Sequence, residues 1–185
     1  MNMVPGTLIY KGTSVEAFSI HCMEYSSGDL EEAEYGSVQA FLTEHSLAEK
    51  STVRWINIAG INHVDEIKKF SEAFNISNLI MEQVLHVSNH SSNQYSEAFI
   101  FNDIKKVYTD DEFNLINENM SIFKRGLTII TFQEKEDHVF EQIRQRIRGK
   151  EGKIRNQASE YLYYCLIDAL RDYYLGCLLY TSPSQ

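Results

Sequence analysis

The sequence predicts an α/β fold, of the α+β type, in which a mixed β-sheet is sandwiched between helices. Two observations predict this class. Around residues 53–85 an apolar, β-forming run is followed by segments of helical periodicity, which is typical of a strand that leads into helices. Residues 97–132 instead form successive strand-like runs separated by short turns, which indicates antiparallel pairing. No linker-like stretch divides the chain, and we therefore expect a single domain over residues 1–176.

The first elements are predicted from short apolar and alternating runs. Residues 7–10 and 16–24 are expected to be strands that pair as a hairpin. The acidic segment 28–35 and the segment 37–44 are both expected to be short exposed helices. Residues 53–58 are then expected to form a strand, because they carry a run of β-forming residues.

Two helices are predicted after that strand. Asn62 is expected to cap the first helix, and Ser77 is expected to begin the second. The side chains expected to face the core recur at helical spacing, and they are Val64, Ile67, Phe70 and Phe74 in the first helix and Leu79, Ile80, Val84 and Leu85 in the second. Residues 86–94, which are rich in Ser and Asn, are expected to be a loop.

The rest of the chain is predicted to be a three-stranded meander followed by two helices. The strands are expected at 97–108, 113–124 and 126–132. Asp137 is expected to cap the first helix, whose buried stripe is Val139, Phe140, Ile143 and Ile147. The polar residues expected to face away from the core are Glu141, Gln142, Arg144, Gln145, Arg146 and Arg148. From about residue 156 a longer helix is expected, one stripe of which carries Tyr161, Cys165, Asp168 and Asp172.

Composition and charge narrow the classes of function. The net charge of −9 argues against nucleic acid as the main partner, and the basic stretch 144–155 contains no aromatic residue to stack on a base. The three cysteines have no metal-type spacing, which indicates a reducing compartment. The sequence has no phosphate-binding glycine loop and no nucleophile motif, so it predicts no enzyme activity. It also has no run of about 20 apolar residues, so we expect no membrane span.

Four strings carry a resemblance to a known family. They are WINIAGI at 55–61, TFQEK at 131–135, VFEQIRQRIR at 139–148 and YLYYCLIDALRDYYL at 161–175. In order and spacing they resemble the cytoplasmic domain of the CorA magnesium and cobalt transporters. The resemblance implies a mixed sheet sandwiched by helices, Mg²⁺ or Co²⁺ as regulatory and transported ion, and a pentameric homo-oligomer. It also implies a location on the cytoplasmic face of the cell membrane, with attachment through a C-terminal segment that follows this domain.

Asp168 and Asp172 are the first candidate metal ligands. They lie one helical turn apart, so both carboxylates share a face of the predicted helix. Mg²⁺ often takes one or two carboxylates and fills its remaining positions with water. The alternative is a solvated acidic face with Arg171 nearby. The resemblance supports the metal role, because in CorA proteins acidic residues of this domain hold divalent metal against an acidic residue of a neighbouring subunit, and Asp168 and Glu82 match such positions.

One position departs from the family pattern. CorA proteins often have Glu followed by Asp where this chain has Glu82 and Gln83. Gln83 offers an amide oxygen but no charge, and two unit charges about 4 Å apart interact by about 4 kcal/mol at an effective dielectric of about 20. We therefore expect weaker regulatory metal binding here. A zinc site at His86 and His90 is less favoured, because these residues straddle a predicted helix end.

The end of the chain and the wider function leave alternatives open. Residues 177–184 read CLLYTSPS, which resembles the translation of a transposon sequencing adapter. Residues 177–185 are therefore expected to be a non-native tail, and a native polar tail is the alternative. The main hypothesis is the cytoplasmic regulatory domain of a CorA-like transporter without its stalk and pore. A zinc transporter of the same superfamily and a free-standing metal-binding or adaptor protein are the other hypotheses.

Overall fold

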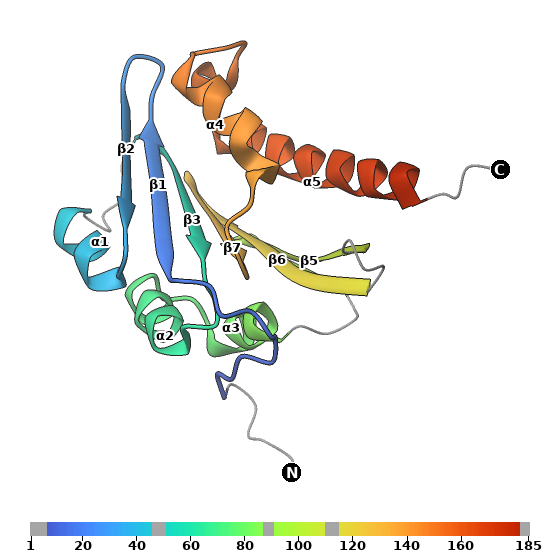
Figure 1. Cartoon of the computed structure of the whole chain (residues 1–185). Coiled ribbons are helices and arrows are strands. Elements are labelled where there is room, and N and C mark those ends of the chain that lie inside the picture. The colour runs from blue at the N-terminus through green and yellow to red at the C-terminus, as the bar shows by residue number, and fades with distance from the viewer. Residues whose placement is uncertain (1–6, 46–50, 87–90, 110–114, 182–185) are drawn as a thin grey trace.

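A computed structural model describes residues 7–45, 51–86, 91–109 and 115–181, with side chains described except at 105–109, 115–117 and 173–181. Strands and helices are mixed along the chain (Figure 1). The strands are β1 (Ser19–Tyr25), β2 (Leu30–Tyr35), β3 (Val53–Ala59), β4 (Ser92–Tyr95), β5 (Ile100–Thr109), β6 (Leu115–Arg125) and β7 (Thr128–Gln133). The helices are α1 (Val38–Glu44), α2 (Val64–Ala73), α3 (Asn78–Leu85), α4 (Glu141–Arg148) and α5 (Ser159–Thr181), with 3-10 helices η1 (His138–Phe140) and η2 (Ile154–Asn156).

The described strands form one seven-stranded sheet in the order β2-β1-β3-β7-β6-β5-β4. β3 and β7 pair in parallel, with Ile56 opposite Ile130, whereas the other neighbouring strands pair antiparallel. The parallel pair follows from a long excursion of the chain, which leaves β3 through α2 and α3 and returns through the meander β5-β6-β7. The predicted mixed sheet and the predicted meander are both confirmed.

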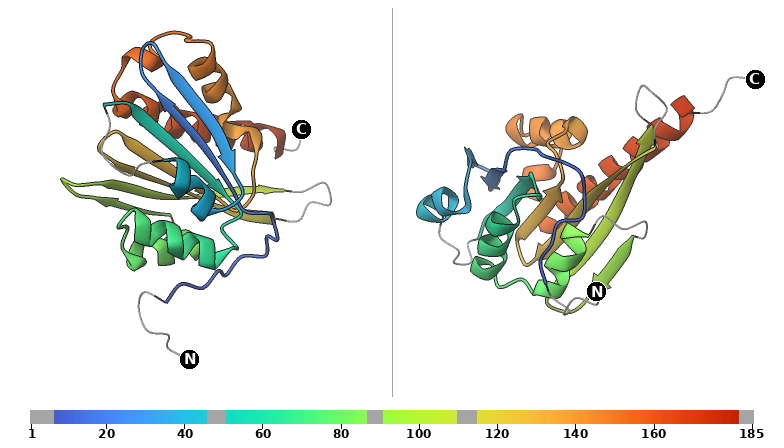
Figure 2. Two further views of the ribbon diagram at one scale, coloured as in Figure 1. Left: turned by 90° about the vertical axis from the view of Figure 1, so that its left-hand side faces the viewer. Right: turned by 60° about the horizontal axis from the view of Figure 1, so that its bottom comes forward.

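Helices cover both faces of the sheet (Figures 1 and 2). α1, α2 and α3 pack on one face, where Phe70 stacks on Phe74 with ring centroids 4.3 Å apart and meets Phe132 edge-on at 6.1 Å. α4 and α5 pack on the other face, around Trp55 and Phe140, whose ring centroids are 5.6 Å apart. The two faces therefore have separate hydrophobic clusters, and the sandwich predicted from the sequence is confirmed.

Residues 7–18 form an extended strap, so the predicted hairpin at the start of the chain is wrong. The hydroxyl of Tyr10 donates a hydrogen bond to Oε2 of the buried Glu134, 2.9 Å away. Gly60 makes room for the strap, because its φ of +78° suits glycine and a Cβ at this position would collide with the carbonyl oxygen of Ala17. The backbone of β1 finds its partners in β2 and β3 instead, one on each side.

The acidic segment 28–35 is a strand, so its predicted helix is wrong. Leu30–Tyr35 forms β2 at the edge of the sheet and pairs with β1. Its side chains alternate between the two faces, with Glu32 toward α4 and Tyr35 in the cluster under α1. Charged residues are common on edge strands, where they discourage pairing with other chains. The helix predicted at 37–44 is confirmed as α1.

Three predictions are wrong at single side chains. The N-cap of α2 is His63 and not Asn62, and no side-chain hydrogen bond caps this helix. Leu79, which is predicted to face the core, is 58% exposed, and Met81 is the residue of α3 that is buried instead. Arg144 is buried under α4, although its polarity predicts exposure. The remaining buried stripes of α2, α3 and α4 follow the predicted spacing.

Two element boundaries also differ from expectation. β4 occupies the end of the segment 86–94, which was predicted to be a loop, and pairs with β5 as an edge strand. α5 begins at Ser159, whose hydroxyl donates to the carbonyl oxygen of Gly126 (2.8 Å), and continues through Thr181. The turn predicted between β5 and β6 lies mostly outside the described residues.

Candidate functional site

A groove of about 500 Å³ lies between α5 on one side and η1 and α4 on the other. The stripe predicted from the sequence forms one wall, and it consists of Tyr161, Cys165, Asp168 and Asp172. The other wall presents His138, Gln142 and Arg146 at intervals of four residues. The fold thus places two candidate metal ligands in a groove whose opposite wall carries basic and amide groups.

The two acids on α5 share one basic partner. Nη1 of Arg171 lies 3.0 Å from Oδ1 of Asp168, and Nη2 lies 3.2 Å from Oδ1 of Asp172. The exposed fractions of the three side chains are 62%, 59% and 68% respectively, so water reaches all of them. Exposed ion pairs of this kind contribute only about 0–1 kcal/mol each. The predicted shared face is confirmed, and Arg171 offsets the repulsion between its two carboxylates.

Glu82, the third candidate ligand, belongs to the opposite layer of the molecule. It is half-buried near the end of α3, whose buried residues pack in the α1–α3 cluster. The neighbouring Gln83 uses its amide Oε1 to accept a hydrogen bond from the hydroxyl of Ser92, 2.8 Å away. The structure therefore places Glu82 and Asp168 on opposite faces of the sheet, too far apart to share one ion within a chain.

The carboxylates on α5 fit one class of metal better than another. Among the described residues, no group of three or more His, Cys, Asp or Glu side chains is placed to hold a metal ion. Structural zinc sites need four protein ligands, whereas Mg²⁺ keeps several waters and binds through one or two carboxylates. Asp168 and Asp172 therefore offer the oxygen ligands that a hydrated Mg²⁺ takes, with its shell completed by water or by a second chain. His90, of the histidine pair considered above, lies outside the described residues.

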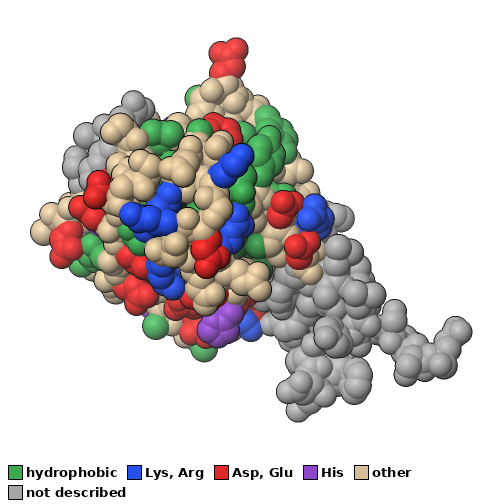
Figure 3. All heavy atoms as spheres, turned by 90° about the horizontal axis from the view of Figure 1, so that it is seen from above, with side chains coloured by type: hydrophobic (Ala, Val, Ile, Leu, Met, Phe, Trp, Pro, Cys, Tyr) green, Lys and Arg blue, Asp and Glu red, His purple; other side chains and the backbone are tan. Residues whose placement is uncertain are grey.

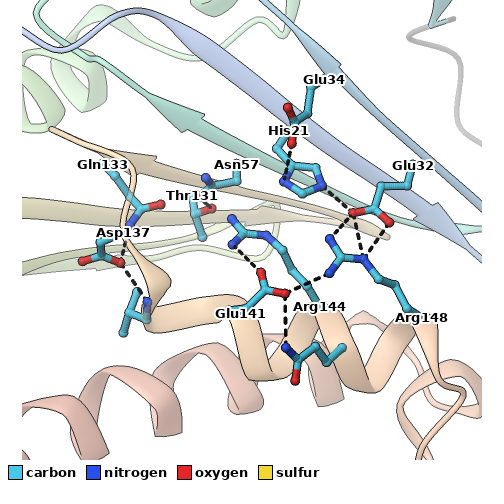
Figure 4. A network of polar contacts seen from close by, with 12 residues as sticks. His21, Glu32, Glu34, Asn57, Thr131, Gln133, Asp137, Glu141, Arg144 and Arg148 are labelled. Atoms are coloured by element: carbon cyan, nitrogen blue, oxygen red, sulfur yellow. Dashed lines mark hydrogen bonds and ion pairs between the residues drawn. The ribbon is translucent and has the colours of Figure 1, made fainter.

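A charged network fixes α4 to the edge of the sheet (Figure 4). Nε2 of the buried His21 on β1 lies 2.6 Å from Oε1 of Glu32 on β2. Arg148 on α4 donates to both oxygens of Glu32, at 2.6 and 2.9 Å, and pairs with Glu141 at 2.9 Å. The hydrogen bonds from Arg148 outweigh burial and, with help from His21, lower the pKa of the Glu32 carboxyl. Ion pairs to an edge strand thus help to set the position of one groove wall.

Polar side chains continue inward beneath α4 (Figure 4). The indole of Trp55 donates to the hydroxyl of Thr131 (3.1 Å), which donates to Oδ1 of Asn57 (2.6 Å). The guanidinium of Arg144 lies over the Trp55 ring, 5.4 Å from its centroid, and Nη2 of Arg144 has no hydrogen-bond partner among the described residues. The contact between α4 and the sheet is therefore partly polar, with one buried donor incompletely satisfied.

The basic stretch 144–155 is largely engaged in contacts within the domain. Besides Arg148, three basic side chains of this stretch donate hydrogen bonds, which are Arg146 to the Tyr161 hydroxyl (3.2 Å), Lys150 to the Gly28 carbonyl (3.0 Å) and Arg155 to the Ile147 carbonyl (2.6 Å). Seen from above, Lys and Arg side chains lie among Asp and Glu (Figure 3). The face in that view therefore presents mixed charge and not the continuous basic surface that phosphate backbones favour.

Comparisons with known proteins give relatives in sequence and in fold. No protein-family model matches the chain. The chain is 36% identical over 176 residues to the cobalt/magnesium transport protein CorA of Thermotoga maritima, which covers 94% of this chain and 49% of that relative. The soluble domain of CorA from Methanocaldococcus jannaschii superposes with a TM-score of 0.62 at 15% identity, over 91% of this chain and 61% of that one. The cytoplasmic domain of ZntB from Vibrio parahaemolyticus superposes with a TM-score of 0.58 at 13% identity, over 87% of this chain and 62% of that one.

The fold places the chain in the class of α/β sandwich domains to which the CorA and ZntB structures belong. The sequence likeness is more specific, and the chain belongs to the CorA family. It spans about half the length of the curated relative it matches, 49%. None of the helices in the described part of the chain combines the length and apolarity needed to cross a membrane.

Sequence reasoning did not assign the α4 wall of the groove to any site. His138, Gln142 and Arg146 recur every four residues, which places them on one helical face. That spacing was the available signal, but nothing local indicates that this face meets α5. The sequence alone indicates only that Arg171 is a charge near the two acids, and its position three residues after Asp168 is the signal for their ion pair.

Proposed function

We propose that this chain is the cytoplasmic regulatory domain of a CorA-like magnesium and cobalt transporter. The observation that carries the proposal is the 36% identity to the Thermotoga cobalt/magnesium transport protein over 94% of this chain. Since the chain spans 49% of that relative, membrane attachment and ion conduction are assigned to the rest of the whole protein. The domain itself has no catalytic residues in this proposal, and it lies on the cytoplasmic face of the membrane.

The proposed role is to sense divalent cations at contacts between subunits of a pentameric ring. Asp168, with Asp172 beside it, and Glu82 would hold Mg²⁺ or Co²⁺ against acidic groups of adjoining subunits. Because these residues lie on opposite faces of the sheet, each would meet a different part of the neighbours. A bound cation favours the closed arrangement, and its loss leaves carboxylates that repel one another and favours opening.

Zinc transport is the second candidate function. The observation in its favour is the likeness to the ZntB cytoplasmic domain, with a TM-score of 0.58, although at 13% identity this likeness concerns the fold alone. The carboxylates of the groove suit Mg²⁺ better than Zn²⁺. Measuring Zn²⁺ and Co²⁺ uptake by a transporter that contains this domain separates the two candidates. If neither ion is taken up, the free-standing metal-binding or adaptor protein is favoured.

A chimeric transporter tests the proposal, with this chain in place of the matched segment of Thermotoga CorA. The measurement is the rise in thermal unfolding temperature on adding Mg²⁺, which follows from ligand binding to the folded state. We expect Mg²⁺ to stabilise the chimera and the Asp168→Asn variant to lose most of that shift. The control is Asp65→Asn, which also removes one exposed carboxylate, but from α2 in the opposite layer. Equal shifts in the chimera and in both variants would show that Asp168 does not bind the cation.

A further inference from the structure

Arg171 is the positively charged side chain that contacts both candidate metal ligands on α5. Its guanidinium reaches Oδ1 of Asp168 at 3.0 Å and Oδ1 of Asp172 at 3.2 Å, and Nε is 3.3 Å from the same Asp172 oxygen. It therefore occupies carboxylate oxygens on both acids at once. A hydrated divalent cation needs oxygens of the same two groups.

We propose that Arg171 is a tethered competitor that sets the divalent-cation affinity of the Asp168–Asp172 pair, an inference that rests on the proposed function of these acids. In the metal-free domain the guanidinium occupies the place of the metal and offsets the repulsion of the carboxylates. Metal binding must displace it or tolerate a positive charge a few ångströms away, and like charges at such distances repel. Either route weakens metal binding.

The surroundings leave Arg171 able to exchange. Its side chain is 62% exposed, so it can turn into water at little cost once a metal takes the carboxylates. Arg146, which lines the groove, is held differently, since Nη2 donates to the Tyr161 hydroxyl at 3.2 Å and Nη1 lies 3.7 Å from Sγ of Cys165. Arg146 is therefore a fixed part of the wall, whereas Arg171 is the exchangeable counterion.

The competitor acts as a threshold device. Because Arg171 belongs to the chain, its concentration beside the two acids does not depend on the composition of the solution. It therefore lowers the affinity of the acid pair for divalent cations by a constant factor, and a higher cation concentration is needed to occupy the site. Gln83 acts in the same direction on the opposite layer, because it carries no charge and its amide oxygen is engaged by Ser92. Both features predict a sensor that responds at higher cation concentrations than a site with acidic residues alone.

The test is a Mn²⁺ titration of the whole 185-residue chain, followed by paramagnetic broadening of backbone amide signals near Asp168 in NMR spectra. We expect Arg171→Gln to tighten Mn²⁺ binding about two- to fivefold, the range that exposed ion pairs support. Arg171→Lys keeps the charge but loses the planar, forked guanidinium, so its Mn²⁺ affinity should lie between those of the wild type and Arg171→Gln. The difference should shrink at high salt, because exposed charges are screened.

Lys153→Gln is the matched control, because it removes the same charge from an exposed position outside the groove. It should leave Mn²⁺ affinity near that of the wild type. Broadening around Asp168 with equal affinity in the wild type and Arg171→Gln would overturn the competitor while leaving the proposed function in place. No broadening near Asp168 in either protein would also overturn the competitor, since removal of Arg171 should expose the site, whereas the proposed function is tested separately by the Mg²⁺ stabilisation of the chimera.

Discussion

The two faces of the central sheet differ in what lies between helix and strand. Under α1, α2 and α3 the contact is dominated by stacked aromatic rings, such as Phe70 on Phe74. Under α4 it includes ion pairs and hydrogen bonds, from His21 and Glu32 to the buried Arg144 (Figure 4). The groove with its acidic wall belongs to this second face.

The comparison separates stability from positioning. Apolar burial is non-directional and contributes roughly in proportion to area, so the aromatic face should dominate the free energy of unfolding. Hydrogen bonds and ion pairs contribute less on average but fix distances and angles. We infer that the α1–α3 face holds the fold together, while the polar contacts of α4 hold the groove walls in register.

The largest effect is expected on the aromatic face. Phe70→Ala should lower the free energy of unfolding by about 3–5 kcal/mol, because it removes a fully buried ring and leaves a cavity. Urea denaturation measures this loss. Leu79→Ala, on the same layer but 58% exposed, is the control and should change stability by less than about 1 kcal/mol. Similar losses for both variants would contradict the importance given to this aromatic core.

A smaller, pH-dependent effect is expected at the edge of the polar face. Arg148 lowers the pKa of Glu32, so the pair contributes stability above the ordinary carboxyl pKa of about 4.3 and loses it as pH falls through the lowered value. Glu32→Gln should therefore destabilise the domain at neutral pH, by about 1 kcal/mol or less. The deficit should shrink as pH falls through the lowered pKa and vanish once the wild-type carboxyl is protonated as well.

Arg148→Gln serves as the matched variant for that pair. It removes the group that lowers the pKa of Glu32, so its urea midpoint should depend less on pH than that of the wild type. Denaturation midpoints at several pH values measure this. A wild-type pH profile that neither variant changes would show that the Glu32 contact does not hold α4.

The smallest effect is expected beneath α4. Arg144→Met keeps a long side chain over Trp55 and removes a buried guanidinium whose Nη2 has no hydrogen-bond partner among the described residues. Replacing a poorly satisfied buried charge by an apolar group is often neutral or stabilising. We expect a change within about 1 kcal/mol in urea denaturation, and a large loss would mean that the Arg144 contact to Glu141 carries more energy than its 3.5 Å separation indicates.

Sequence reasoning succeeded where the signal is local. The spacing of Ile67, Phe70 and Phe74 identified the buried stripe of α2, and the spacing of Asp168 and Asp172 placed two acids on one face. It failed where tertiary partners decide, as at the acidic strand β2, whose conformation depends on pairing with β1. The burial of polar groups under α4 also depends on contacts distant in sequence, such as that of Trp55 with Thr131, and the engagement of Gln83 by Ser92 depends on where β4 joins the sheet.

The proposed function depends most on Asp168, which we propose to be the sensor of the divalent cation in this CorA-family domain. Cobalt uptake into proteoliposomes by the chimera with Thermotoga CorA tests it, with Mg²⁺ varied on the side of the domain and the unaltered Thermotoga protein alongside. We expect Mg²⁺ to suppress uptake by the chimera, Asp168→Asn to require several-fold more Mg²⁺ for the same suppression, and Asp65→Asn to behave like the parent chimera. Mg²⁺ suppression that is identical in the parent and Asp168→Asn would contradict it.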